Sequence, residues 1–561
     1  MVPHPRRAVT SLAAIAAFVS PLASASAGDL LLHNARIVTL DAKSTVHQAL
    51  VVRDGRILAT GNAAAMRATA APDATAIDLG GRTVIPGLID SHIHAIRAGL
   101  TYTTEVSWIG ARSIAEALDR IRAAASRAAP GAWIVVAGGW SERQFAELRR
   151  PSQAEVIAAA PGRPVYIQLA YRAALLTPEA HAALGIVADG DVPPKGTLEQ
   201  DSAGRRTGWI AGDGPTIVAL FDRLPKPDLA TAKAGTRAFF RALNRVGLTG
   251  VIDPGGHNLA PGDYAALFAL QREGALTLRV AYSIFAPRPG SELADFQTIT
   301  RDLPRGLTSG DGLLRFNGIG ECVTWGMYNN EQPTPAQKEA YFQVARWAAG
   351  QGLRLTQHWS RDASAHHLLE VFERVNAEIP LAPLRWSIAH VHDATPATLA
   401  RMKSLGVGWL MQNALYYAAP FFLQQRGPAA LATMPPITSA IAMGLPVGAG
   451  TDAHRVMDFN PFVALRWMLD GRTVEGTATR GERETPTREQ ALRLYTQGSA
   501  WFTGDETERG TLQPGSLADL AVLDRDFFAV PIAEIGEIEA VLTLVGGKIV
   551  YGARDFAGLA P

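Results

Sequence analysis

The chain has 561 residues, of which 47% are hydrophobic and 19% charged, a composition typical of a globular protein rather than a disordered or fibrous one. Its length allows two to four structural units around a large core. The formal net charge of +1, with no basic stripe among aromatic residues, argues against a nucleic-acid-binding protein and against a polybasic membrane protein.

The first 27 residues have the pattern of a signal peptide. Arg6 and Arg7 precede an apolar stretch over residues 8–22, and a small-residue cleavage site follows at residues 25–27. The stretch is short and rich in Ala and Ser for a membrane span, although an uncleaved anchor is the alternative. We expect cleavage after about Ala27, by either general or twin-arginine export, and a periplasmic or secreted product without a stable membrane anchor. With Cys322 as its single cysteine, such a product has no internal disulfide.

Both ends of the remaining chain are rich in β-strand patterns. Residues 29–40 and 49–61 form two hairpin-like pieces, the second around an Asp54-Gly55 turn. Near the C-terminus, short strands are expected at residues 517–523, 538–545 and 548–551. We therefore predict one small β-sandwich domain built from both termini, over residues 28–82 and 508–561.

The middle of the chain, residues 83–507, alternates apolar strand-like segments with helical ones, which indicates βαβ units. Eight such segments predict an α/β fold with a (β/α)8 TIM-like barrel, whose chemistry would lie at the C-terminal ends of the strands: 84–90, 249–253, 278–284, 315–321, 353–358, 385–390, 407–411 and 447–451. The gap between the first two segments is too long for one helix. It holds strand patterns at 133–137 and 165–169, so we predict an inserted α/β subdomain at about 108–227.

Histidine and carboxylate side chains occur at or just past the ends of these segments. His92 and His94 lie two positions apart, and side chains at that spacing point to the same side of an extended chain. One such histidine alone is more often a core residue, but the whole set predicts a divalent metal site, zinc being favoured, with one or two ions. The expected ligands are His92, His94, His358, His390, Asp452 and Glu321. Asp452 is also the expected catalytic base, because a carboxylate beside a metal can pass a proton to a leaving amine.

At this point the chain resembles the amidohydrolase superfamily and, within it, the YtcJ-like group (amidohydrolase family 3). The resemblance rests on Pro-Gly-Leu-Ile-Asp-Ser-His-Ile-His at 86–94, Ile-Ala-His at 388–390, Gly-Thr-Asp at 450–452 and Thr-Leu-Gln-Pro-Gly-Ser-Leu-Ala-Asp-Leu at 511–520. It implies a metal-dependent hydrolase of non-peptide C–N bonds, including those of substituted and cyclic amides.

One departure from the family pattern bears on the metal site. Many relatives carry a carbamylated lysine on the fourth strand that bridges two metals, and that position aligns with Asn317. Glu321, four residues on, faces the same side of an extended chain. Glu321 either supplies the missing carboxylate or binds substrate. The site could therefore hold one metal ion or two, and a single tight site is slightly favoured.

Four further residues are candidates for binding substrate: Arg172, Trp140, Trp325 and His454. The alternatives are a surface or structural role for Arg172, packing against the inserted subdomain for Trp325, and a solvated loop histidine for His454. We expect an exported metal-dependent amidohydrolase that cleaves a small-molecule amide or cyclic amide through metal-activated water, and a homodimer is compatible with the resemblance. The competing hypotheses are a mononuclear zinc deaminase of an amino-heterocycle and, because the lysine is missing, a degenerate non-catalytic barrel.

Overall fold

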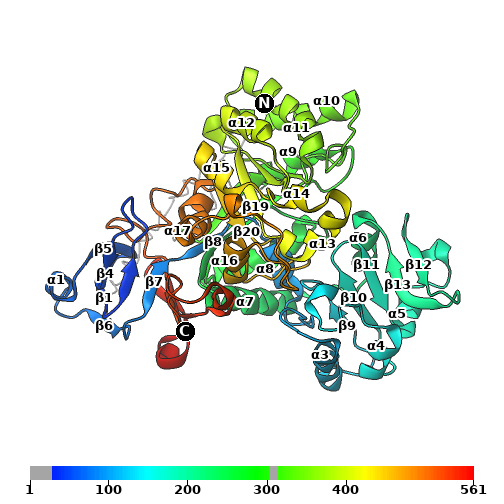
Figure 1. Cartoon of the computed structure of the whole chain (residues 1–561), viewed down its shortest axis with the longest axis horizontal. Coiled ribbons are helices and arrows are strands. Elements are labelled where there is room, and N and C mark those ends of the chain that lie inside the picture. The colour runs from blue at the N-terminus through cyan, green and yellow to red at the C-terminus, as the bar shows by residue number, and fades with distance from the viewer. Residues whose placement is uncertain (1–27, 303–311) are drawn as a thin grey trace, which may run out of the picture.

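The computed structural model describes residues 28–302 and 312–561 (Figure 1). The expected signal peptide, residues 1–27, lies outside the described residues. Strands and helices alternate through most of the chain, which confirms the expected α/β class. None of the helices in the described part of the chain is long and apolar enough to cross a membrane.

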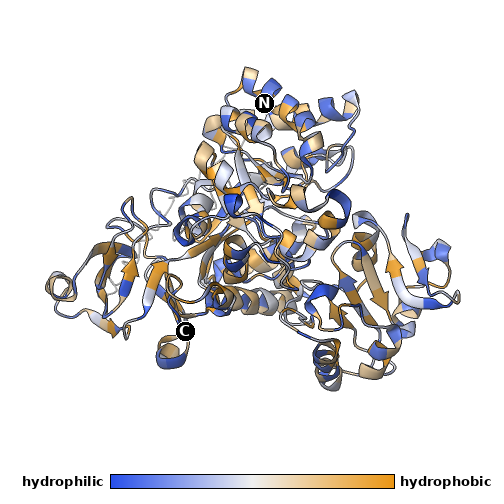
Figure 2. Ribbon diagram, viewed as in Figure 1, coloured by the Kyte–Doolittle hydropathy of each residue, from blue (hydrophilic) through white to orange (hydrophobic). Residues whose placement is uncertain are grey.

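Eight parallel strands form the centre of the molecule. They make two four-stranded sheets with the orders β8-β14-β15-β16 and β17-β18-β19-β20. Backbone hydrogen bonds connect the sheets at both edges, from Ser91 N to Ala449 O (3.0 Å) and from Ile319 N to Arg354 O (3.1 Å). Most residues of these strands are buried, and the outer helices in Figure 2 carry hydrophilic as well as hydrophobic segments. Their bounds are β8 Leu88–Asp90, β14 Leu248–Asp253, β15 Arg279–Ile284, β16 Leu314–Ile319, β17 Thr356–Trp359, β18 Ser387–His390, β19 Gly408–Gln412 and β20 Val447–Gly450.

Amphipathic helices surround these strands. In α7 the side chain of Asp228 accepts a hydrogen bond from Thr231 N and caps the helix, and Phe239, Phe240 and Leu243 line its buried face, as the helical period requires. The main helices of this part are α2 Ala95–Thr101, α7 Leu229–Arg245, α8 Ala265–Arg272, α9 Glu292–Asp302, α10 Pro335–Gly350, α11 Asp362–Glu378, α12 Pro396–Leu405, α13 Leu415–Arg426, α14 Pro428–Leu431, α15 Ile437–Met443, α16 Pro461–Asp470, α17 Arg488–Arg493 and α18 Ser499–Trp501.

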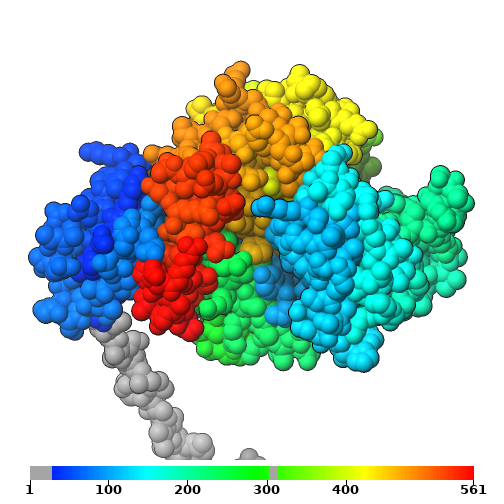
Figure 3. Space-filling model, turned by 60° about the horizontal axis from the view of Figure 1, so that its bottom comes forward, coloured from blue at the N-terminus to red at the C-terminus, as the bar shows by residue number. Residues whose placement is uncertain are grey.

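Two further sheets contain the terminal segments. One has the order β5-β4-β1-β6, and the other, β23-β22-β21-β7-β2-β3, combines strands from both ends of the chain. Figure 3 shows the N-terminal (blue) and C-terminal (red) segments side by side. Their bounds are β1 Leu30–His33, β2 Arg36–Val38, β3 Val46–His47, β4 Ala49–Arg53, β5 Arg56–Gly61, α1 Ala63–Thr69, β6 Thr75–Asp78, β7 Thr83–Pro86, β21 Leu520–Leu523, β22 Ala540–Val545 and β23 Lys548–Gly552.

Two sequence-based expectations are wrong in this region. Residues 29–40 are not a hairpin, because β1 pairs with β4 and β6 whereas β2 pairs with β3 and β7. The chain changes sheets at Asn34, which has a left-handed φ of 53°. The single strand expected at 84–90 is two strands, β7 and β8. They separate at Gly87, where a β-carbon would lie 2.3 Å from the Thr249 side chain, so this close approach requires glycine.

A buried ion cluster joins the terminal sheet to the central strands. Asp519 precedes β21, and its carboxylate accepts hydrogen bonds from Arg279 Nε (2.7 Å), at the start of β15, and from Arg509 Nε (3.1 Å). Gly546 N donates to the same carboxylate at 2.7 Å. All three charged side chains are buried, so each depends on the others for its hydrogen bonds.

The segment between α2 and α7 has a five-stranded sheet of its own, in the order β12-β13-β11-β10-β9 (Figure 1). It contacts the loop after β20, where Gly139 N donates to Arg455 O at 3.0 Å. The domain limits given above stay a prediction. The elements of this inserted segment are α3 Ile114–Arg127, β9 Ile134–Val136, α4 Gln153–Ala159, β10 Val165–Leu169, β11 Ala173–Leu176, α5 Pro178–Ala183, β12 Thr197–Gln200, β13 Arg206–Ala211 and α6 Gly214–Asp222.

Candidate metal centre

Glu321 lies at the centre of a buried cluster of imidazoles. Its Oε1 is 2.8 Å from His390 Nε2 and 3.6 Å from His92 Nε2, and it also accepts a hydrogen bond from His358 Nδ1. Its Oε2 lies 3.6 Å from His94 Nε2. One carboxylate therefore contacts four histidines that come from three different strand ends.

Asp452 completes the cluster from the end of β20. Its Oδ1 lies 3.1 Å from His94 Nε2 and 3.7 Å from His92 Nε2. Burial alone would raise the pKa of Asp452, but the hydrogen bond from His94 and the charge of His390 outweigh it and hold that pKa below its usual value. The structure thus brings together all six side chains expected as metal ligands. Their roles as ligands stay a prediction.

The local backbone positions these groups. Asp90, the last residue of β8, accepts hydrogen bonds from His92 N (3.0 Å) and from Thr451 Oγ1 (2.7 Å), and so connects the loops after β8 and β20. His390 and Asp452 have left-handed φ angles of 73° and 58°. Such angles are costly for residues other than glycine and are concentrated at functional sites.

The donor set fits a divalent cation. His92 is fully buried, and neither of its ring nitrogens has a hydrogen-bond partner in the described structure. Burial lowers the pKa of His92 to about 3, so its ring is neutral and able to bind a metal. Three overlapping groups have ligand atoms within 4.8 Å of one another: His92, His94 and Glu321; His92, His390 and Asp452; Glu321, His358 and His390.

The other ring nitrogen of a metal-binding histidine is commonly held by a backbone carbonyl, and His94 shows this arrangement. Its Nδ1 lies 2.6 Å from the carbonyl oxygen of Gly255, just past β14, which leaves Nε2 directed toward Glu321 and Asp452. This contact orients the imidazole before any cation binds, so the ring loses little freedom on binding.

Three of the four residues expected to bind substrate make their contacts elsewhere. Arg172 is 58% exposed and pairs with Glu142 inside the inserted segment. Trp140 is buried and donates to Gln168 O at 2.8 Å. His454 Nε2 lies 2.7 Å from Glu105 Oε2, away from the metal-ligand cluster. In this conformation Arg172 Nη2, Trp140 Nε1 and His454 Nε2 are each engaged by other groups of the protein.

Trp325 lies in an aromatic group beside the cluster, with the ring of His257 at 5.7 Å. Tyr328 belongs to this group, because its hydroxyl is 3.1 Å from His257 Nε2 and its ring is 4.8 Å from that of His358. Sequence reasoning missed both His257 and Tyr328. His257 follows a Pro-Gly-Gly turn just past β14, so a histidine close to a strand end was the signal that could have found it.

The comparisons with known proteins concern the chain as a whole. The sequence profile of the amidohydrolase family matches residues 75–551. The N-substituted formamide deformylase of Arthrobacter pascens is 25% identical over 552 residues, which are 93% of this chain and 98% of that protein. The amidohydrolase YtcJ of Bacillus subtilis is 21% identical over 545 residues, 92% and 98% of the two chains.

Solved structures show a similar fold. An uncharacterised metal-dependent hydrolase from Pyrococcus horikoshii has a TM-score of 0.66 at 19% identity, over 90% of this chain and 99% of that one. Atrazine chlorohydrolase TrzN from Arthrobacter aurescens, solved with zinc, has a TM-score of 0.52 at 17% identity, over 93% of this chain and 95% of that one. The expected enzyme class, a metal-dependent hydrolase acting on C–N bonds other than peptide bonds, is confirmed. The profile match covers most of the sequence, and the chain therefore belongs to the amidohydrolase family.

Proposed function

We propose that the eight parallel strands work as one (β/α)8 barrel that carries an amidohydrolase site for a small non-peptide amide or cyclic amide. The observation that carries this proposal is Glu321, whose two carboxylate oxygens face four imidazoles, three of them buried. Such a set of nitrogen and oxygen ligands suits zinc and similar divalent ions. The terminal sheets and the inserted segment would then frame the barrel, as the sequence predicts.

We further propose that the six side chains of this cluster would hold one or two divalent cations. His92, His358 and His390 lie at Oε1 of Glu321, and His94 lies at Oε2. Zinc is our choice because histidine nitrogens dominate the donor set and because the similar TrzN was solved with zinc. A divalent cation held there would act as a Lewis acid toward water and toward a substrate carbonyl.

Asp452 would transfer the proton during hydrolysis. Asp452 is ionised at neutral pH, since its pKa lies below the usual value. It can therefore take a proton at a carboxylate oxygen and release it to the nitrogen that leaves. Asp90 holds the Asp452 loop against β8 through Thr451, and His94 is fixed by Gly255 O. Both contacts keep the base and the ligands in one geometry, which hydrolysis requires.

The decisive experiment is a substrate panel with zinc-loaded enzyme: N-substituted formamides, other secondary amides, lactams, hydantoins and amino-heterocycles. Formamides enter the panel because the Arthrobacter relative is named for them. We expect release of an amine and a carboxylate from at least one amide class. Ammonia release from amino-heterocycles alone would establish a deaminase instead. Less than about half an equivalent of zinc, manganese or iron in metal-replete protein would establish a non-catalytic barrel.

We also propose that the protein is exported. The support is the basic, then apolar, then small-residue pattern of residues 1–27. N-terminal sequencing of protein recovered from the native host is expected to begin at about Gly28. A sequence beginning at Met1 or Val2 would refute export with cleavage.

A further inference from the structure

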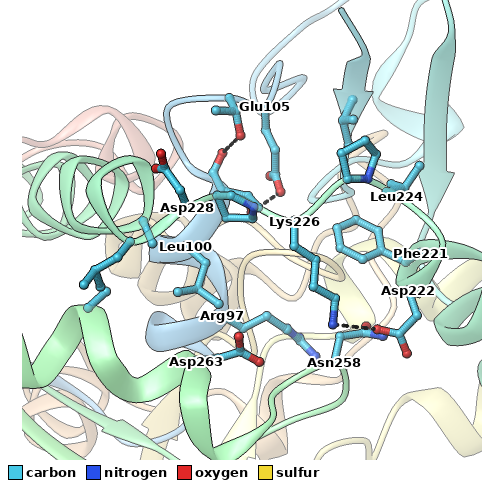
Figure 4. Close-up of a pocket in the computed structure, with 18 of the residues that line it drawn as sticks. Arg97, Leu100, Glu105, Phe221, Asp222, Leu224, Lys226, Asp228, Asn258 and Asp263 are labelled. Carbon is cyan, nitrogen blue, oxygen red and sulfur yellow. Dashed lines mark hydrogen bonds and ion pairs between the residues drawn. The ribbon is translucent and has the colours of Figure 1, made fainter.

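A cavity outside the metal-ligand cluster is lined by Arg97, three residues after His94. Its volume is about 240 Å³. It lies between the barrel helices α2, α7 and α8 on one side and the end of the inserted segment, residues 221–228, on the other (Figure 4). Arg97 Nη1 and His94 Nδ1 both lie within 3.2 Å of the position that a β-carbon on Gly256 would take. Arg97 therefore lies close to His94, whereas none of the six expected metal ligands lines the cavity.

Two buried arginines line this cavity. Arg97 is 3% exposed and Arg455 is 2% exposed. Each has an Nε without a hydrogen-bond partner, and no carboxylate of the described residues lies within 4.0 Å of either guanidinium. Arg97 has one long contact, from Nη1 to His257 O at 3.5 Å, and Arg455 donates from Nη1 to Asn258 at 2.6 Å. A guanidinium carries five N–H donors, so most of these donors are unused.

The positive charges of Arg97 and Arg455 repel each other. Burial and the neighbouring Arg97 lower the pKa of Arg455. The buried carboxylates nearest to them are committed to other groups, since Asp253 accepts from Ile96 N and Gly255 N, and Glu105 accepts from Thr101 and His454. Buried donors of this kind are costly when unpaired. An anion in the cavity would satisfy them.

The rest of the lining indicates the type of anion. Leu100, Phe221 and Leu224 surround the arginines, and Phe221 stacks under Arg455 with 3.7 Å from Cζ to the ring centroid. These walls favour a ligand with an apolar body. The lining also holds the carboxylates of Glu105, Asp228 and Asp263, together with Asp222, which pairs with Lys226 at 3.8 Å. The carboxylates would repel a dianion more strongly than a monoanion. A carboxylate suits the site better than a phosphate.

We propose that Arg97 and Arg455 form a binding site for a small organic monocarboxylate with an apolar body, separate from the catalytic metal centre. Planar guanidinium groups match a carboxylate bidentately. The size of the cavity limits the ligand to a small molecule, since binding pockets for drug-sized ligands begin at about 300 Å³. This inference does not depend on the reaction proposed above.

The test is isothermal titration of metal-loaded protein with benzoate, with its neutral analogue benzamide and inorganic phosphate as comparisons. We expect saturable benzoate binding with one site per chain and no detectable binding of the other two. Arg97→Gln and Arg455→Gln should each weaken benzoate binding at least tenfold, because charged hydrogen bonds are lost. Lys233→Gln removes one positive charge from α7 outside the cavity lining, where Lys233 pairs with Glu273. Its benzoate affinity should stay within about twofold, since charges outside the cavity are screened by salt.

Two further variants keep the test decisive if the glutamine variants fail to fold. Arg455→Lys keeps the charge but loses the planar fork, and Ala232→Leu fills the cavity from α7; both should weaken benzoate binding at least tenfold. No binding by the wild type would overturn the proposal. So would equal benzoate affinity in wild type and in every folded variant of these residues, because benzoate would then bind elsewhere, for example at the metal centre. Phosphate binding of equal strength would also overturn the assignment to a monocarboxylate.

Discussion

Glu321→Gln tests the metal centre most directly. The substitution keeps the size of the side chain and one oxygen but removes the negative charge. The Glu321 oxygens lie 2.8 Å from His390 Nε2 and 3.6 Å from the Nε2 atoms of His92 and His94. A cation held by those nitrogens therefore feels the carboxylate at short range, in a site from which water is largely excluded.

The expected loss of metal affinity follows from this short distance. Two unit charges about 4 Å apart interact by about 4 kcal/mol at an effective dielectric constant of 20. Each 1.4 kcal/mol corresponds to about a factor of ten in affinity, so the neutral amide should weaken binding of a divalent cation by about 10³-fold or more. If Glu321 is shared between two ions, at least one of them should be lost on dialysis.

The assay is the metal content per chain of dialysed protein, together with turnover of the best amide in the panel. Glu484→Gln is the matched control, because Glu484 is also buried but accepts its hydrogen bonds from Thr438 and Ser439. We expect the control to keep the wild-type metal content. Unchanged metal with an altered KM alone would make Glu321 a substrate-binding residue. Unchanged metal and unchanged kinetics would refute the reasoning.

Two further predictions concern the base and the ion cluster. Asp452→Asn should weaken metal binding less than Glu321→Gln does, because Asp452 lies near two of the four imidazoles and the amide keeps one ligand oxygen. In metal-loaded protein it should lower kcat by about 10²- to 10⁴-fold, the usual contribution of a general base; full activity at saturating substrate would remove Asp452 from the mechanism. Asp519→Asn should lower the free energy of unfolding by about 3–5 kcal/mol, because Arg279 and Arg509 lose their buried partner. Burial raises the pKa of Asp519, but the two arginines outweigh it and keep that pKa below its ordinary value. The stabilisation is therefore present above about pH 4, the ordinary range of an aspartate, and is lost as the pH falls below it. Denaturant unfolding from pH 3 to 7 should show that the free energy of unfolding falls less with acid in the variant than in the wild type. Identical pH profiles of the two proteins would contradict this prediction.

The site residues that the sequence predicts well are those attached to strand ends. His92, His94, His390 and Asp452 follow apolar runs directly, and a parallel arrangement brings the ends of such runs together. Arg172 and Trp140 belong to the inserted segment, whose placement depends on tertiary contacts. Their partners Glu142 and Gln168 are about 30 residues away along the chain, and no local pattern identifies them.

The strand at 84–90 illustrates a different limit. Its continuous apolar pattern correctly predicts that the segment is buried, but the pattern does not show that Pro86 and Leu88 belong to different sheets. The division follows from the close approach of Gly87 to Thr249, a residue about 160 positions further along the chain. Only the folded structure supplies that contact, so the pattern predicts one strand where two exist.

The position of Glu321 gives a physical reason for the missing lysine. The resemblance to the family implies a carbamylated lysine at the place of Asn317, and such a group brings one negative charge and two oxygens to the metals. Glu321 has the same charge and the same number of oxygens, and it lies two residues past the end of β16. Asn317 itself is buried with an unpartnered Oδ1 and makes no contact with the cluster among the hydrogen bonds of the described residues. Glu321 can thus offer the four imidazoles a carboxylate like the one that the resemblance implies at position 317. If Glu321 takes that role, Glu321→Gln should not be rescued by Asn317→Lys with added bicarbonate; recovery of metal and turnover in that double variant would instead show that a carbamylated lysine at position 317 reaches the metals.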